Sequence, residues 1–145
     1  MTASTTLDRG TTTDELRDRA ELSDLISRLY VAMDAHQFDD LRGIFTDDAT
    51  ATTPGGMASG REALIEQAAR NHTSDVTHHH LTTNVLVEVD GDRASVRANQ
   101  LVLFNRNNRV EQAIGTVNRF TARRTADGWR LTTLDTDLLW RQAFA

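Results

Sequence analysis

The feature that most constrains the fold of this chain is a change of hydrophobic period near residue 77. Before that point apolar residues recur every three or four positions, whereas after it long stretches alternate with a period close to two. The first period is typical of amphipathic helices, and the second of strands that bury one face. Helices followed by a run of strands predict an α+β domain, because an α/β sheet would alternate the two.

Three helices are predicted in the first half of the chain. The longest runs from residue 13 or 14 to about residue 36, and acidic side chains in its first turn favour the positive end of its dipole. A shorter helix is predicted over residues 38–45. The third is predicted to open at a capping box formed by Ser59 and Glu62 and to run to about Arg70. The apolar stripe of the longest helix consists of Leu22, Leu25, Ile26, Leu29, Tyr30 and Met33.

Four long strands are predicted after residue 77, paired into two hairpins. The turn sequences Asp-Gly-Asp at 90–92 and Ala-Asp-Gly at 126–128 each separate two strand-like runs. A curved antiparallel sheet with one apolar face, closed by about three helices, forms a cone with an internal pocket. The predicted strands are 81–89, 93–104, 109–124 and 129–140.

Length and composition exclude several classes of protein. The 145 residues predict one domain, residues 13–145, after a loose polar tail, residues 1–12. Cysteine and lysine are both absent, which removes thiolate nucleophiles and Schiff-base chemistry. A net charge of -5 without a basic cluster argues against binding to nucleic acid. No apolar run approaches the roughly 20 residues of a membrane span and no signal peptide is evident, so we predict a cytoplasmic protein without membrane association.

The stretch THHHLTTN, residues 77–84, raises the question of a metal site. On a strand, His78 and His80 project to one face and His79 to the other. An H-x-H pair needs a third and usually a fourth ligand, and no ligand-spaced motif accompanies it, so we predict neither a metal nor a cofactor. Two readings stay open. The histidines are solvated and structural, or one of them, His80 unless a bulge substitutes His79, is a general acid or base.

Asp34 and Tyr30 share the apolar side of the predicted long helix. A carboxylate there is costly unless it is paired, so Asp34 is expected either to orient a histidine or to bond the nearby backbone. Tyr30, one turn earlier, is either a core aromatic or a donor to a substrate oxygen. Asn118 lies in a predicted strand, where an inward amide would provide a polar contact in an apolar pocket.

Several runs of sequence resemble the SnoaL-like branch of the NTF2-like superfamily, from Asp14 to Trp140. They are LISRLYVAMDAHQFDDLRGIFTDDAT, the helix start GREA, HHHLTTNVLVEVDGDRA, DGWRL and the closing LLW. The resemblance implies the cone fold with a pocket for a small molecule. The superfamily includes dehydratases, isomerases, polyketide cyclases, epoxide hydrolases and members without known catalysis.

The resemblance also implies roles for individual residues. In dehydratases of this type, an Asp near the end of the first helix pairs with a His at the start of the first long strand, and Asp34 and His80 match these positions. Tyr30 matches a tyrosine of the bile-acid dehydratases, and Asn118 a substrate-contacting asparagine of scytalone dehydratase. Scytalone dehydratase places two tyrosines on its substrate carbonyl, whereas this chain has one Tyr in total and Met33 at one of those positions.

Together these observations predict cofactor-independent acid–base chemistry on a small, apolar, oxygenated molecule such as a polyketide or another secondary metabolite. His80 is expected to remove a proton α to a carbonyl, with Asp34 orienting it and Tyr30 or Asn118 polarising the oxygen. Dehydratase, isomerase and cyclase all begin with this step. The candidate substrate contacts are Asn118, His79 at the rim and Trp140, which is also expected in the core or on a dimer surface.

Two alternatives belong to other classes. An epoxide hydrolase would use Asp34 to activate water, with Arg97 or Arg119 and Asp135 or Asp137 alongside. A non-catalytic module would bind a small molecule without transforming it. Whatever the function, we expect a homodimer, because a curved sheet of this kind leaves an apolar outer face that a neighbouring subunit usually covers.

Overall fold

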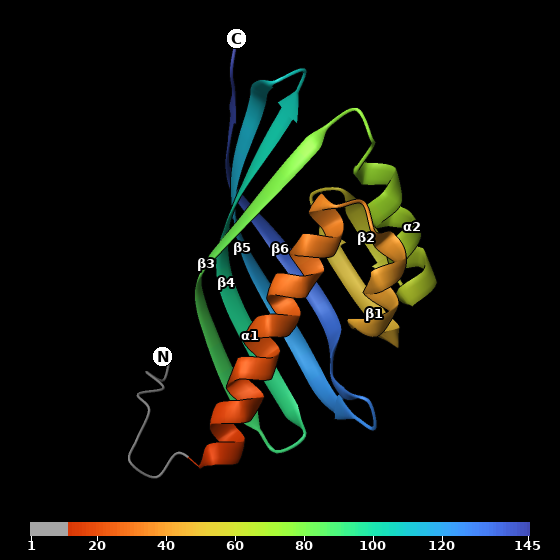
Figure 1. Ribbon diagram of the computed structural model, residues 1–145, viewed down its shortest axis with the longest axis vertical. Helices are drawn as coiled ribbons and strands as arrows, with labels where there is room; N and C mark the ends of the chain where they lie inside the picture. Colours follow the sequence, from red (N-terminus) through yellow and green to blue (C-terminus); the bar gives the residue numbers. More distant parts are fainter. Residues whose placement is uncertain (1–11) are drawn as a thin grey trace.

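Helix α1 and helix α2 both lie against one side of a six-stranded, strongly bent sheet (Figure 1). The computed structural model describes residues 12–145 and confirms the α+β class and the NTF2-like arrangement. The elements are α1 (Thr13–Asp34), the 3-10 helix η1 (Phe38–Gly43), β1 (Phe45–Thr53), β2 (Gly56–Ser59), α2 (Arg61–Asn71), β3 (Thr77–Asp90), β4 (Arg93–Arg106), β5 (Arg109–Thr125) and β6 (Gly128–Ala143).

The strands follow the order β2-β1-β6-β5-β4-β3. Strands β3 to β6 form the predicted antiparallel meander, with its two hairpins at the predicted turns. The sheet extends beyond the predicted antiparallel part, because β1 pairs with β6 in parallel. A parallel neighbour requires a long connection, and the whole length of the chain between β1 and β6 supplies it. The sheet is therefore mixed.

Helix α1 begins at a capping box that the sequence analysis did not single out. The Thr12 hydroxyl accepts a hydrogen bond from the Glu15 N–H, and the Glu15 carboxylate accepts one from the Thr12 N–H. Thr12 is the only residue of the predicted tail that the structure describes. The helix ends two residues earlier than predicted, since His36 adopts a left-handed φ of 56°. No helix within residues 12–145 has the length and apolar character needed to cross a membrane.

The segment between α1 and α2 differs from the prediction in three details. The short helix is a 3-10 helix that ends at Gly43, and Phe45 already belongs to β1, as does the Thr-rich segment after it. The capping box at Ser59 is absent. Helix α2 starts from Gly60, whose φ of 91° favours glycine, and no side chain caps it. The Glu62 carboxylate instead pairs with Arg42.

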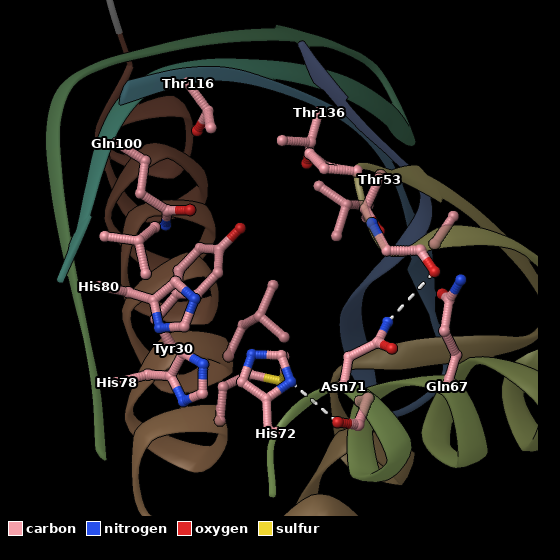
Figure 2. A pocket seen from close by; sticks show the side chains of 18 of the residues that line it. Tyr30, Thr53, Gln67, Asn71, His72, His78, His80, Gln100, Thr116 and Thr136 are labelled. Atoms are coloured by element: carbon pink, nitrogen blue, oxygen red, sulfur yellow. Dashed lines mark hydrogen bonds between the residues drawn. The ribbon is translucent and has the colours of Figure 1, made fainter. Parts of the chain in front are cut away.

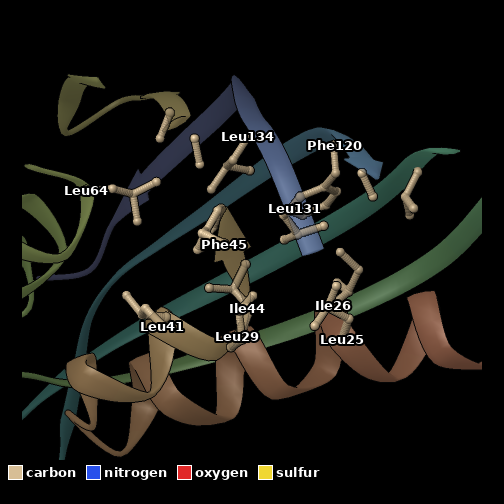
Figure 3. Packing of buried hydrophobic residues seen from close by; sticks show 14 of the residues in the cluster. Leu25, Ile26, Leu29, Leu41, Ile44, Phe45, Leu64, Phe120, Leu131 and Leu134 are labelled. Carbon is tan, nitrogen blue, oxygen red and sulfur yellow. The ribbon is translucent and has the colours of Figure 1, made fainter. Parts of the chain in front are cut away.

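The core lies between the apolar stripe of α1 and the facing strands (Figure 3). The predicted stripe is buried from Leu22 to Tyr30, and its partners across the interface include Phe45, Phe120 and Leu131. Burial of these large side chains supplies the main stabilisation of the domain, at about 25 cal/mol per Å² of apolar surface removed from water.

A partly buried ion pair fixes the first half of α1 to the β5–β6 hairpin. Asp18 is 8% exposed and accepts hydrogen bonds from Arg124 at 2.9 and 2.8 Å and from the Trp129 indole at 3.0 Å. The hydrogen bonds from Arg124 hold the pKa of Asp18 below its usual range, although burial opposes them. Because the carboxylate is satisfied only in this position, it specifies how α1 lies on the sheet.

The packing of α1 predicts the effect of truncating its stripe. Leu22 is fully buried, so Leu22→Ala should lower the free energy of unfolding by about 2–5 kcal/mol, through lost burial and a residual cavity. Urea denaturation measures this change. The matched control is Leu86→Ala on β3, where the side chain is 61% exposed and a change below about 0.5 kcal/mol is expected. Equal losses in the two variants would contradict the assignment of the core.

Candidate active site

A cavity of about 360 Å³ lies between α1, α2 and the concave face of the sheet (Figure 2). Its size fits a small organic molecule, and most of its wall is apolar. None of the side chains that line it is Asp or Glu. The polar groups fall into three sets. One set comes from α1, β3, β4 and the end of α2, the second from α2 and β1, and the third from β5 and β6. The first comprises Tyr30, His72, His78, His80 and Gln100, the second comprises Thr53, Gln67 and Asn71, and the third comprises Gln112, Thr116, Thr136 and Arg141.

Asp34 and His80 are in direct contact. Asp34 is the last residue of α1, and His80 is the fourth residue of β3. The His80 ring Nδ1 lies 2.5 Å from Asp34 Oδ1, and the His80 backbone N–H donates to Asp34 Oδ2 at 3.1 Å. The carboxylate accepts only, so Nδ1 carries the proton, and the neutral ring keeps a lone pair on Nε2. His80 lines the cavity, so this lone pair is available to a bound molecule.

The electrostatics of Asp34 favour its ionised form. Partial burial raises the pKa of Asp34, but the hydrogen bonds from the His80 ring and backbone outweigh burial and hold that pKa below its usual range. The carboxylate therefore stays charged at neutral pH. A fixed negative charge beside Nδ1 stabilises the imidazolium that forms when Nε2 takes a proton.

The Tyr30 hydroxyl is held by a buried amide. Asn118 Nδ2 donates to the Tyr30 oxygen at 2.8 Å and to Gln100 Oε1 at 3.0 Å, and Asn118 Oδ1 accepts from Thr116 at 3.3 Å. The Tyr30 ring stacks on the His80 ring with 4.9 Å between centroids. Burial raises the pKa of Tyr30, so its hydroxyl stays protonated. Its oxygen accepts from Asn118, and Gln100 also lies within hydrogen-bonding reach of the same hydroxyl.

Two further histidines line the same wall. His78 is 4% exposed, and its buried Nδ1 has no hydrogen-bond partner within residues 12–145. His72, the C-terminal cap of α2, packs 4.6 Å from His78 and 5.7 Å from His80 between ring centroids. In the described part of the chain, no three His, Asp or Glu side chains are placed so that they could hold a metal ion.

The structure separates the predicted site residues into two groups. His80 and Tyr30 line the cavity and Asp34 contacts His80 from outside the lining, whereas Asn118 is fully buried behind Tyr30 and does not line the cavity. His79 is exposed on the opposite face of β3, as the alternation of a strand requires, because the bulge of β3 comes only after Thr83.

Trp140 also lies away from the cavity. Ile114 and Thr116 both line the cavity, so Gly115 between them faces outward, and the Trp140 ring covers this glycine. A Cβ at position 115 would lie 2.1 Å from Trp140 Nε1, so the close approach requires glycine. The predicted substrate contacts at His79 and Trp140 therefore find no counterpart in this geometry.

Sequence reasoning missed His72 and Gln100. Gln100 sits on β4 directly opposite Thr82 and Thr116 in the strand register, so it shares their inward face. That pairing could have been inferred from the two predicted hairpins, because their turns fix the register. His72 carries no such signal, since the rings that it packs against come from η1 and β3.

Comparison with known proteins places the chain in a family. Residues 14–135 match the model of the SnoaL-like domain, so the chain belongs to this family. An uncharacterized protein of Mycobacterium tuberculosis is 33% identical over 122 residues, which cover 81% of this chain and 82% of that protein. The family assignment confirms the resemblance drawn from the sequence runs.

Solved structures show the same fold. The type 2 hexachlorocyclohexane dehydrochlorinase LinA is similar with a TM-score of 0.80 and 26% identity, over 91% of this chain and 92% of that chain. A scytalone dehydratase-like protein of Novosphingobium aromaticivorans has a TM-score of 0.78 at 17% identity, over 92% and 93% of the two chains. The second likeness concerns the fold alone.

The buried His78 predicts a pH dependence of stability. Burial, together with the nearby His72 and His80, lowers the pKa of His78 to about 4, while an unfolded His titrates near 6.5. Between these values the unfolded chain binds more protons, so the free energy of unfolding should fall as pH drops from about 6.5 to about 4. Urea denaturation across this range measures the slope. His78→Phe should reduce it, and the exposed His79→Phe should leave it unchanged; equal slopes in the two variants would contradict the prediction.

Proposed function

We propose that this protein is a cofactor-independent lyase that acts on a small, largely apolar, oxygenated molecule, such as a polyketide or another secondary metabolite. The observation that carries the proposal is the Asp34–His80 pair, in which Nδ1 faces the carboxylate and His80 lines the cavity with its Nε2 unpaired within residues 12–145. Proton abstraction from carbon needs three parts, which are a base paired with a carboxylate, an O–H donor, and an apolar pocket. The proposal includes the cytoplasmic location predicted from the sequence.

The reaction begins when His80 Nε2 removes a proton from the carbon next to a carbonyl group. Asp34 stabilises the resulting imidazolium, and the Tyr30 O–H donates to the carbonyl oxygen, where negative charge develops. Asn118 is a positioning residue, because it holds the Tyr30 oxygen. The electron pair then forms a double bond as a substituent leaves the neighbouring carbon. General base catalysis of this kind contributes about 10²–10⁴ to the rate.

Elimination is favoured over the other outcomes by the comparison with LinA, which is named as a dehydrochlorinase and shares 26% identity with this chain. An isomerase or a cyclase would share the first step and differ in the fate of the carbanion. The epoxide hydrolase alternative loses support, since Arg97, Arg119, Asp135 and Asp137 do not line the cavity. Arg119 instead forms an exposed ion pair with Asp137.

Hydrogen exchange tests the proposed base directly. Cyclohexanone incubated with the protein in D₂O should lose its α-hydrogens faster than in buffer, as followed by proton NMR. His80→Gln should slow the catalysed exchange by about 100-fold or more, because the base is removed. Asp34→Asn should slow it by roughly tenfold to 100-fold, because a charge-assisted hydrogen bond worth about 1.5–3 kcal/mol is lost.

The control for this experiment is His79→Gln, which removes an exposed imidazole from the same strand and should leave exchange unchanged. Exchange that does not depend on His80 would contradict the proposed base. If the protein binds the ketone without any exchange above buffer, the non-catalytic binding module becomes the better account.

A homodimer formed through the outer face of the sheet is part of the proposal. Strand register aligns Leu81, Leu101, Gly115 and Trp140 in one row across β3, β4, β5 and β6. Leu81, Leu101 and Trp140 are 46%, 36% and 48% exposed, and Leu139 beside them is 64% exposed. An exposed apolar row of this kind is typical of a protein–protein interface.

The interface can be tested by light scattering. The wild-type protein at micromolar concentration should have the mass of a dimer, and Leu101→Arg should shift it to the monomer, because an unpaired charge at the centre of the interface is costly. Leu86→Arg, on β3 but outside the row, is the control and should remain dimeric. A monomeric wild type, or a dimer that tolerates Leu101→Arg, would contradict this interface.

A further inference from the structure

His72 occupies the end of helix α2, where backbone carbonyls lack partners within the helix. Its ring Nδ1 lies 2.8 Å from the Ala68 carbonyl oxygen, four residues earlier. Rings on both sides hold its orientation, with the His78 centroid at 4.6 Å and the Phe38 centroid at 6.2 Å. The imidazole is therefore fixed by one hydrogen bond and by packing against two neighbouring rings.

This hydrogen bond determines the tautomer of His72. A carbonyl oxygen only accepts, so Nδ1 must carry the hydrogen. Burial lowers the pKa of His72, so the ring is neutral at pH 7 and Nε2 keeps its lone pair. His72 lines the cavity, and Figure 2 shows the ring edge opposite the Ala68 bond facing the cavity beside His80. Nε2 has no hydrogen-bond partner among the residues that the structure describes.

Tyr30, His72 and His80 thus lie among the polar groups of one wall of the cavity. The proposed proton abstraction uses the lone pair of His80 and the O–H of Tyr30, and it leaves the lone pair of His72 unused. A hydroxyl group on the carbon that loses its substituent has a hydrogen to donate to this lone pair. A halogen at that position has none and would place its own lone pairs against Nε2.

We propose that His72 selects substrates with a hydroxyl leaving group, by accepting a hydrogen bond from that hydroxyl at Nε2. The substrate class is then a β-hydroxy carbonyl compound, and the reaction is a dehydration. This inference rests on the proposed function, because it assigns the leaving group in a reaction that His80 begins. It also distinguishes this chain from LinA, the relative named as a dehydrochlorinase.

The reaction balances without another reagent. His80 Nε2 takes the α-hydrogen as a proton, and the electron pair of that C–H bond becomes the new double bond. The C–O bond to the β-hydroxyl breaks, and its electron pair leaves with oxygen. The proton on His80 Nε2 passes to this oxygen, and water departs. His72 gains no proton. It turns the O–H of the substrate toward α2, so that the lone pairs of the oxygen face His80.

Binding can be tested apart from catalysis with two ketones that cannot eliminate. The probe 2,2-dimethyl-3-hydroxycyclohexanone keeps the carbonyl and the β-hydroxyl but has no hydrogen on the carbon between them, and 2,2-dimethylcyclohexanone lacks the hydroxyl. In nitrogen-15 NMR of the histidine side chains, the resonance of His72 Nε2 should shift upfield when the hydroxy ketone is added. It should not shift when 2,2-dimethylcyclohexanone is added. A His72 resonance that responds to neither, while other cavity residues report binding, would overturn the inference.

Kinetics with 3-hydroxycyclohexanone give a second test. His72→Phe keeps an aromatic ring and removes the acceptor, so kcat/KM for dehydration should fall about tenfold, the value of one hydrogen bond. His72→Gln restores an acceptor and should recover part of the loss. Cyclohexanone has no β-hydroxyl, so exchange of its α-hydrogens in D₂O should lose clearly less than dehydration does in His72→Phe. His79→Phe is the matched control and should leave both reactions unchanged. An equal loss of exchange and dehydration in His72→Phe would overturn the selective role of His72.

The two proposals fail in different ways. Exchange that depends on His80 together with a silent His72 resonance overturns the inference and keeps the proposed lyase. A His72 resonance that responds to the hydroxy ketone, in a protein without His80-dependent exchange, supports the recognition of a hydroxyl and overturns the proposed base.

Discussion

The contact between Asp34 and His80 determines where the rest of the site can lie. A single carboxylate joins the last turn of α1 to β3 through both the backbone and the ring of His80. At the other end of the same helix, the Asp18 carboxylate binds Arg124 and Trp129 of the β5–β6 hairpin. An unpaired carboxylate at either position would carry a large desolvation cost. The two pairings therefore fix both ends of α1 on the sheet, and the cavity between them follows.

The polar groups behind the cavity wall bond mainly to one another. Asn118 uses both amide hydrogens and its oxygen within the wall, and Gln100 donates to Thr82 at 3.2 Å. Such a buried network is stable when its members are satisfied, and it keeps the groups at its edge rigid. What remains for a ligand is a small set of atoms with fixed roles. Chemistry is thus concentrated in the Tyr30 hydroxyl and in the free nitrogens of the histidines.

Local sequence patterns predicted the parts of the structure that depend on neighbours along the chain. The apolar stripe of α1 and both hairpins follow from period and turn chemistry, and the Asp34–His80 contact was expected from the family pattern. The parallel pairing of β1 with β6 was not predicted. It joins segments more than 70 residues apart, and β1 is a Thr-rich stretch without a clear hydrophobic period. His72 lies close to His78 and His80 along the chain, but it was missed because only the tertiary fold turns its ring beside theirs.

The charge balance of the cavity explains why a dyad of this kind can work without a metal ion in the proposed reaction. Before proton abstraction the group formed by Asp34, His80 and Tyr30 holds one negative charge, on Asp34, and Arg141 elsewhere in the cavity lining keeps its positive charge throughout. After abstraction the group with its substrate holds Asp34, a protonated His80 and a negatively charged substrate oxygen, so the net charge is the same. No charge has to enter or leave a pocket whose lining contains neither Asp nor Glu. The new imidazolium lies between the two negative groups, in an environment where such attractions are stronger than in water. The Tyr30 hydroxyl has to supply only the remaining stabilisation, and its raised pKa keeps the required hydrogen in place.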